Sequence, residues 1–164
     1  MSVFDENGLS AAAPEPGAQV QDEQGFAEAP LAPLHPTSDA PRMVIVEDAP
    51  LIALDLAETM RELGFDVRAT AFTHEQALTE IERTVPQFAI VGLHLGVGEG
   101  DVDRGEALLE LLDELGCRCL IFSGDEEACR RVAARYPHFP VLSKPAQPET
   151  LVAEIQKLRA LGAG

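Results

Sequence analysis

Residues 87–95 read QFAIVGLHL, an apolar run that is interrupted by Gly92. The consecutive apolar residues from Phe88 to Val91 are typical of a strand that is buried on both faces of a sheet. The chain then becomes rich in glycine and acidic residues from Gly96 to Arg104, which indicates a loop. We therefore predict a buried strand over Phe88–Leu93 and an acidic loop at its carboxyl end.

Similar apolar strands occur on both sides of this run, and helical patterns separate them. We predict the other strands at Met43–Glu47, Val67–Phe72, Arg118–Ser123 and Phe139–Ser143. The predicted helices run from Pro50 to Gly64, from Thr73 through Ile81, over Glu106–Leu115, from the cap Asp125 to Arg135, and from Pro148 to near Ala160. This alternation favours an α/β fold: a flavodoxin-like, doubly wound parallel sheet with strand order 2-1-3-4-5.

Polar residues stand where three of the predicted strands end. Glu47 and Asp48 follow the first strand, Ser123 ends the fourth, and Lys144 follows the fifth. The carboxyl ends of parallel strands lie at one edge of the sheet, and ligands bind there near the switch point between the first and third strands. We therefore expect Glu47, Asp48 and Gly92 to meet at this edge, flanked by Ser123 and Lys144.

An acidic pair, a hydroxyl and a lysine at these positions resemble the active site of the receiver domain of two-component response regulators, the CheY-like domains. The resemblance covers residues 42–160. It implies that the acidic pair and an acceptor aspartate hold Mg²⁺, while the lysine and the hydroxyl contact the transferred phosphoryl group. The position of the acceptor aspartate is Gly92 in this chain.

Carried over residue by residue, the resemblance makes Glu47, Asp48 and the backbone carbonyl of His94 the magnesium ligands. Because the third carboxylate is missing, Mg²⁺ is expected to bind weakly if it binds at all. Without a carboxylate at Gly92, the two that remain are expected to pair with Lys144 instead.

The resemblance also assigns the parts that respond to phosphorylation. Ser123 becomes the switch hydroxyl and Lys144 the charge partner, with a cis peptide bond before Pro145. The aromatic residue that usually moves with the hydroxyl is Val141 here, which is a second departure from the family pattern.

Gly92 offers no atom that can attack phosphorus, so normal aspartyl phosphorylation is excluded at this position. A carboxylate of the following loop, Glu99, Asp101 or Asp103, is the alternative acceptor, although a flexible donor is poorly placed for in-line attack. A structural alternative is that glycine provides an unusual backbone angle at the end of the strand.

Composition narrows the function further. The net charge of -16 disfavours contact with nucleic acid or anionic lipid. The sequence shows no signal peptide and no apolar run long enough to span a membrane, and its three cysteines predict reduced thiols in a cytoplasmic protein. Cys117, Cys119 and Cys129 are interpreted as packing residues.

Residues 1–41 differ from the rest of the chain. They hold six of the twelve prolines and no lysine or arginine, so we predict a disordered, acidic tail ahead of a receiver-like domain over 42–160. Phe4, Phe26, Leu31 and Leu34 are its candidate apolar anchors.

The favoured function is a single-domain pseudo-receiver in phosphorelay signalling, which binds proteins and is not an enzyme. The expected partner is a sensor histidine kinase or a phosphotransfer protein, and the expected contacts are the helix over Leu51–Leu63 and the region from Ser123 to Val141. The chain itself is expected to be a monomer or a weak homodimer. One alternative is a phosphoacceptor regulator whose native acceptor was mutated at Gly92 or is a loop carboxylate. Another is a flavodoxin-like cofactor-binding enzyme domain, which is disfavoured because Glu47 and Asp48 would repel a phosphate after the first strand.

Overall fold

The computed structural model describes residues 39–96 and 101–162. The predicted disordered tail lies outside the described residues as far as residue 38. Within the described ranges, no helix is long and apolar enough to cross a membrane.

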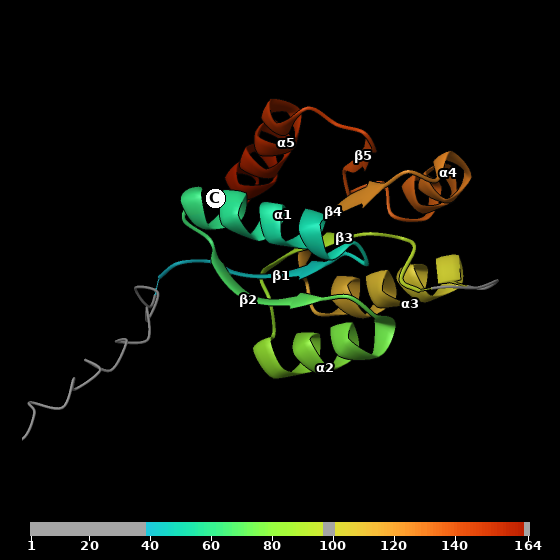
Figure 1. The fold of residues 1–164 in the computed structure, drawn as a ribbon, viewed down its shortest axis with the longest axis horizontal. Helices are drawn as coiled ribbons and strands as arrows, with labels where there is room; N and C mark the ends of the chain where they lie inside the picture. The colour runs from blue at the N-terminus through green and yellow to red at the C-terminus, as the bar shows by residue number, and fades with distance from the viewer. Residues whose placement is uncertain (1–38, 97–100, 163–164) are drawn as a thin grey trace, which may run out of the picture. The chain divides into compact units, whose positions relative to one another are not determined.

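The strands form one parallel sheet in the order β2-β1-β3-β4-β5 (Figure 1). They are β1 (Arg42–Val46), β2 (Asp66–Ala71), β3 (Phe88–Val91), β4 (Arg118–Ser123) and β5 (Val141–Ser143). The helices that follow them are α1 (Pro50–Glu62), α2 (His74–Thr84), α3 (Asp101–Glu114), α4 (Glu126–Arg135) and α5 (Pro148–Ala160). The predicted fold class and strand order are confirmed.

Alternation along the central strands divides the core between the two faces of the sheet. Met43 and Ile45 of β1 pack in one apolar cluster with residues of α1 and α5. Val44 and Val46 pack in the other cluster, with residues of α2, α3 and α4. Figure 1 shows α1 and α5 on one side of the sheet and α2 and α3 on the other. Since both faces are covered, the ends of the strands are where polar chemistry reaches the surface.

The region after β3 corrects the sequence prediction. Helix α3 begins at Asp101, whereas a loop was predicted as far as Arg104. Gly105, which is typical of a loop, lies inside the helix at a place where α3 packs closely on the chain that leaves β3. A Cβ atom at Gly105 would lie only 2.7 Å from the Cα of Leu93. Acidic residues also suit the first turn of a helix, where the backbone dipole is positive.

Two strands are also shorter than predicted. β3 ends at Val91 and β5 begins at Val141, so neither reaches the predicted limits of Leu93 and Phe139. Leu93 is nevertheless fully buried, because it packs in the core beneath α2 and α3 after its backbone has left the sheet. The apolar side chain of Leu93 is therefore explained by its burial in the core, and Leu93 is not part of the strand.

Candidate functional site

Backbone hydrogen bonds carry the strand register past the last paired residues and bring the predicted site residues to one edge of the sheet. The Gly92 N–H donates to the Val46 carbonyl at 2.8 Å, and the Lys144 N–H donates to the Ser123 carbonyl at 2.9 Å. We call Glu47, Asp48, Gly92, Ser123 and Lys144 the carboxyl-edge site. Its position at the switch point between β1 and β3 agrees with the prediction.

The centre of the carboxyl-edge site is an ion pair. Lys144 Nζ lies 2.5 Å from Glu47 Oε2, and it also sits 5.0 Å from the centre of the Phe122 ring. The other carboxylate oxygen of Glu47 accepts the N–H of Ala49 at 3.2 Å. The Glu47 side chain is only 1% exposed, and that of Lys144 is 25% exposed. Both oxygens of Glu47 therefore have partners. Of the two carboxylates expected to pair with Lys144, Glu47 does so, and no ion pair joins Asp48 to Lys144 in the described part of the chain.

Burial has the largest effect on the ionisation of Glu47. Removal from water raises the pKa of Glu47 above its ordinary value, and the neighbouring Asp48 carboxyl adds to that rise. The hydrogen bond from Lys144 and the N–H of Ala49 act in the opposite direction and favour the carboxylate. Lys144 is thus the main group that opposes the rise in the pKa of Glu47.

Gly92 lies against this ion pair in a conformation that any residue can adopt. Its φ angle is not positive, unlike those of Gly64, Gly96 and Gly116. The explanation of Gly92 by an unusual backbone angle is therefore wrong. A Cβ atom at Gly92 would lie 3.3 Å from the Val46 carbonyl oxygen and 3.5 Å from Glu47 Oε2. A side chain would be tight but would point at the carboxylate that Lys144 holds.

The residues present fit a magnesium ion poorly. Asp48 is exposed, and Glu47 is already bonded to Lys144. Among the residues that the structure describes, no group of three or more His, Cys, Asp or Glu side chains is arranged to hold a metal. Of the alternative acceptors, Glu99 lies outside the described residues, and Asp101 belongs to helix α3 rather than to a loop, as does Asp103. Weak magnesium binding stays a prediction.

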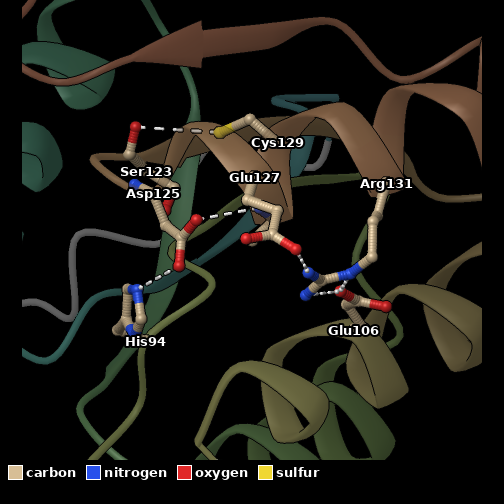
Figure 2. A network of polar contacts seen from close by, with 8 residues as sticks. His94, Glu106, Ser123, Asp125, Glu127, Cys129 and Arg131 are labelled. Atoms are coloured by element: carbon tan, nitrogen blue, oxygen red, sulfur yellow. Dashed lines mark hydrogen bonds and ion pairs between the residues drawn. The ribbon is translucent and has the colours of Figure 1, made fainter.

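Ser123 is buried at the corner between β4 and α4. It is 2% exposed, and its hydroxyl oxygen accepts the N–H of Asp125 at 3.3 Å. Its carbonyl accepts a weak bond from the thiol of Cys129, with Sγ 3.9 Å away. Figure 2 shows Ser123 held between Asp125 and Cys129 at the start of α4. The predicted switch hydroxyl is therefore hydrogen-bonded to the helix cap, and among the described residues no hydrogen bond joins it to the side chain of Glu47 or Lys144.

His94 contributes a contact that the sequence did not reveal. Its Nε2 lies 3.2 Å from Oδ2 of Asp125, while Oδ1 of Asp125 accepts the N–H of Ala128 at 2.8 Å and caps α4 (Figure 2). The N–H of Ala128 is the main cause that lowers the pKa of Asp125, and His94 adds to it. The pair links the chain that follows β3 to the first turn of α4. Only the backbone carbonyl of His94 was predicted to matter, because a contact across 31 residues leaves no local pattern.

Comparison with known proteins adds the fold relationship. The sequence matches no protein-family model and no curated protein. The receiver domain of the response regulator PhyR from Erythrobacter litoralis matches with a TM-score of 0.63 and 24% identity, covering 76% of this chain and 94% of that chain. The response regulator PhyR from Brucella abortus matches with a TM-score of 0.62 and 26% identity over 74% of this chain. A receiver domain of a modulated diguanylate cyclase from Desulfovibrio desulfuricans G20 matches with a TM-score of 0.61 and 28% identity, covering 75% and 96%.

The chain has the fold of a response-regulator receiver domain. The match to PhyR from Brucella abortus extends over 49% of that protein, so this chain corresponds to about half of its length. The Lys144–Pro145 peptide bond is cis, as the resemblance implied.

The surface of the domain has a cavity beside β5 and an exposed apolar region on α1. Val141 is half-buried and lines a cavity of about 360 Å³ between α4 and β5, together with Cys129 and Ala133. The second feature lies on α1, where Leu51 is 82% exposed and Leu54 is 62% exposed. A cavity of about 700 Å³ between α1 and the chain after β5 adjoins Leu51.

The three cysteines are buried and form no disulfide. Burial raises the pKa of the Cys119 thiol well above its ordinary value and also raises the pKa of the Cys129 thiol. All three side chains pack in the apolar core on one face of the sheet, as predicted.

Proposed function

We propose that the chain is a response-regulator-like signalling module that binds proteins and accepts no phosphoryl group, a pseudo-receiver of a phosphorelay. The receiver domains that share its fold support the signalling class. The observation that carries the rest of the proposal is the ion pair of Glu47 and Lys144 beside Gly92. In this arrangement no nucleophile is present at Gly92, and the cation that would neutralise a phosphoryl group is already neutralised by a buried carboxylate.

The partner we propose is a sensor histidine kinase or a phosphotransfer protein that docks on α1. Leu51 and Leu54 expose apolar surface on consecutive turns of this helix, and the adjoining cavity of about 700 Å³ can receive a side chain of the partner. Direct binding to nucleic acid is disfavoured by the net charge of -16. The three buried, reduced thiols support a cytoplasmic location.

Phosphorylation by a small acyl phosphate tests the proposal. The full chain is incubated with acetyl phosphate and Mg²⁺, and covalent phosphate is measured by intact-mass spectrometry. We expect no adduct on the wild-type protein, because Gly92 supplies no acceptor oxygen and Lys144 is bound to Glu47. A stoichiometric adduct on the wild type would overturn the proposal and would favour a loop carboxylate as the acceptor.

Gly92→Asp provides the positive arm of the same experiment. The Cβ atom of the new side chain would lie 3.5 Å from Glu47 Oε2, so we expect its carboxylate to compete with Glu47 for Lys144. We expect this variant to gain one phosphoryl group per chain, and Gly92→Asn, which has the same shape but a poor nucleophile, to gain none. Equal labelling of both variants would show that the phosphate resides elsewhere.

A further inference from the structure

Basic side chains are scarce in this chain, which has twelve lysines and arginines against twenty-eight acidic residues. Within the described residues, seven of the twelve form ion pairs with carboxylates: Arg68, Arg83, Arg104, Arg131, Arg135, Lys144 and Lys157. Of the five that do not, Arg42, Arg118 and Arg159 line one cavity. Three guanidinium groups without a carboxylate partner in the described structure are therefore gathered in one place.

This cavity lies at the amino ends of the strands, at the edge opposite the carboxyl-edge site. Arg42, Phe88 and Arg118 are the first residues of β1, β3 and β4, and all three line it. Its volume is about 560 Å³, within the range of roughly 300–1,000 Å³ that is usual for small-molecule sites. Asp39 is the one acidic residue among its described lining residues, and it is exposed.

Backbone carbonyls hold two of the three guanidinium groups in place. Arg42 donates from Nε to the Thr84 carbonyl at 3.2 Å and from Nη2 to the Val85 carbonyl at 3.1 Å. Arg159 donates from Nη1 to the Leu63 carbonyl at 2.8 Å. Each guanidinium has five N–H donors, so these contacts fix the two side chains and leave further donors on both.

Aromatic rings hold Arg118 and support Arg159. The guanidinium of Arg118 lies 5.2 Å from the centre of the Phe88 ring, and that of Arg159 lies 5.1 Å from the centre of the Phe65 ring. The two rings contact each other edge to face at 5.1 Å. Each of these two cations therefore contacts one ring of a packed aromatic pair. Among the described residues, the Arg118 guanidinium has no hydrogen-bond acceptor.

From this arrangement we propose that the cavity of Arg42, Arg118 and Arg159 binds a small molecule that carries a diphosphate group. Guanidinium groups recognise phosphate oxygens through paired N–H donors, and fixed side chains lose little entropy on binding. A diphosphate carries several negative charges that can be distributed over the three cations, and this local attraction has to exceed the repulsion from the net charge of -16, which acts on every anion. The site is independent of the carboxyl-edge site and of the function proposed for it.

Titration of the full chain with inorganic pyrophosphate tests the site, with GDP as the nucleotide form and citrate as a carboxylate of similar charge. Binding is followed by the backbone amide resonances of Arg118 and Gly162 and by isothermal titration calorimetry. We expect saturable binding of pyrophosphate or GDP and no comparable binding of citrate. Preference for GDP identifies a nucleotide as the source of the diphosphate, and preference for pyrophosphate identifies the inorganic ion.

Two variants separate a specific site from general charge attraction. Arg118→Gln removes one fork of donors and is expected to weaken diphosphate binding about tenfold. Gly162→Ala keeps all three charges, but its Cβ would overlap the guanidinium of Arg118 and displace it, so it is expected to weaken binding too. Arg61→Gln is the matched control, because Arg61 is exposed on α1 outside the cavity and loses the same charge.

The outcomes are decisive even where Arg118→Gln loses stability, since Gly162 lies beyond α5 and its substitution leaves the core unchanged. Weaker binding in Arg118→Gln and Gly162→Ala, with Arg61→Gln unchanged, supports the site. Absence of saturable binding, stronger binding of citrate, or equal weakening by Arg61→Gln would overturn it.

Discussion

At the scale of single residues, Glu47 and Lys144 form an ion pair beside Gly92. The Nζ atom of Lys144 lies 2.5 Å from Oε2 of the buried Glu47, and the other carboxylate oxygen of Glu47 accepts the N–H of Ala49. Each charge is the partner of the other, and burial makes either one costly to leave alone. The stability of the site therefore depends on both residues.

Lys144→Met is expected to destabilise the protein in a pH-dependent way. Lys144 lowers the pKa of Glu47 and burial raises it, so removal of the lysine raises this pKa further above its ordinary value of 4.5. The folded protein then retains a proton that the unfolded chain has released, and the free energy of unfolding falls as the pH rises above 4.5. The loss relative to the wild type should be small at acidic pH and about 2 kcal/mol at neutral pH, below the usual 3–5 because Lys144 is partly exposed.

Urea unfolding of both proteins over this pH range measures the difference. In Glu47→Gln/Lys144→Met the titrating acid is gone, so the additional pH dependence should disappear. A deficit in Lys144→Met that does not change with pH would mean that lost packing against Phe122, rather than the buried charge, is responsible.

At the scale of elements, the order of strands and helices could be predicted from the sequence, whereas the start of helix α3 could not. Strand order and helix order follow from the alternation of apolar runs. Thr73, at which a helix was predicted to begin, caps α2 by accepting the N–H of Gln76. The start of α3 was missed because glycine is a poor helix former, and at Gly105 the close contact of the helix with Leu93 leaves no room for a side chain. That contact is tertiary and has no signature in local sequence.

Gly105→Ala is expected to lower the free energy of unfolding by about 2 kcal/mol, since a methyl group would collide with the backbone of Leu93 and overpack the helix. Gly124→Ala is the matched control. Its Cβ would meet only the Cβ of Lys144, at an ordinary 3.8 Å, so the change should be close to zero. Chemical denaturation compares the two variants, and equal stabilities would contradict the close packing of α3.

The same division holds for the candidate site. The strand ends that carry Glu47, Gly92 and Lys144 could be predicted, because a parallel sheet places all of its carboxyl ends on one edge. The choice of Glu47 over Asp48 as the partner of Lys144 could not, since it depends on which side chain turns inward. Contacts between distant segments, such as His94 with Asp125, also lie beyond what local sequence patterns predict.

At the scale of the whole molecule, the distribution of charge is uneven. The chain carries a net charge of -16, yet Arg42, Arg118 and Arg159 are gathered at the amino edge of the sheet. Mutual repulsion of so many carboxylates opposes compaction. Among the described residues, every ion pair except that of Glu47 and Lys144 has at least one exposed partner, and such pairs contribute little.

Added salt is therefore expected to stabilise the protein. Raising the potassium chloride concentration from roughly 0.01 M to 0.15 M shortens the screening length from about 30 Å to about 8 Å and weakens long-range repulsion more than contact pairs. The melting temperature, followed by circular dichroism at neutral pH, should rise. A fall would mean that attractive ion pairs outweigh the repulsion.

The ion pair at the carboxyl edge has a consequence for timing. In a receiver that is phosphorylated, the lifetime of the acyl phosphate limits how long the active form persists. In the function proposed here Lys144 is bound to Glu47 whether or not a kinase is active, and no covalent intermediate decays. The amount of complex formed with the partner would then depend on the concentration of this protein and on the affinity of α1 for the partner. Degradation of the protein, rather than dephosphorylation, would end the signal.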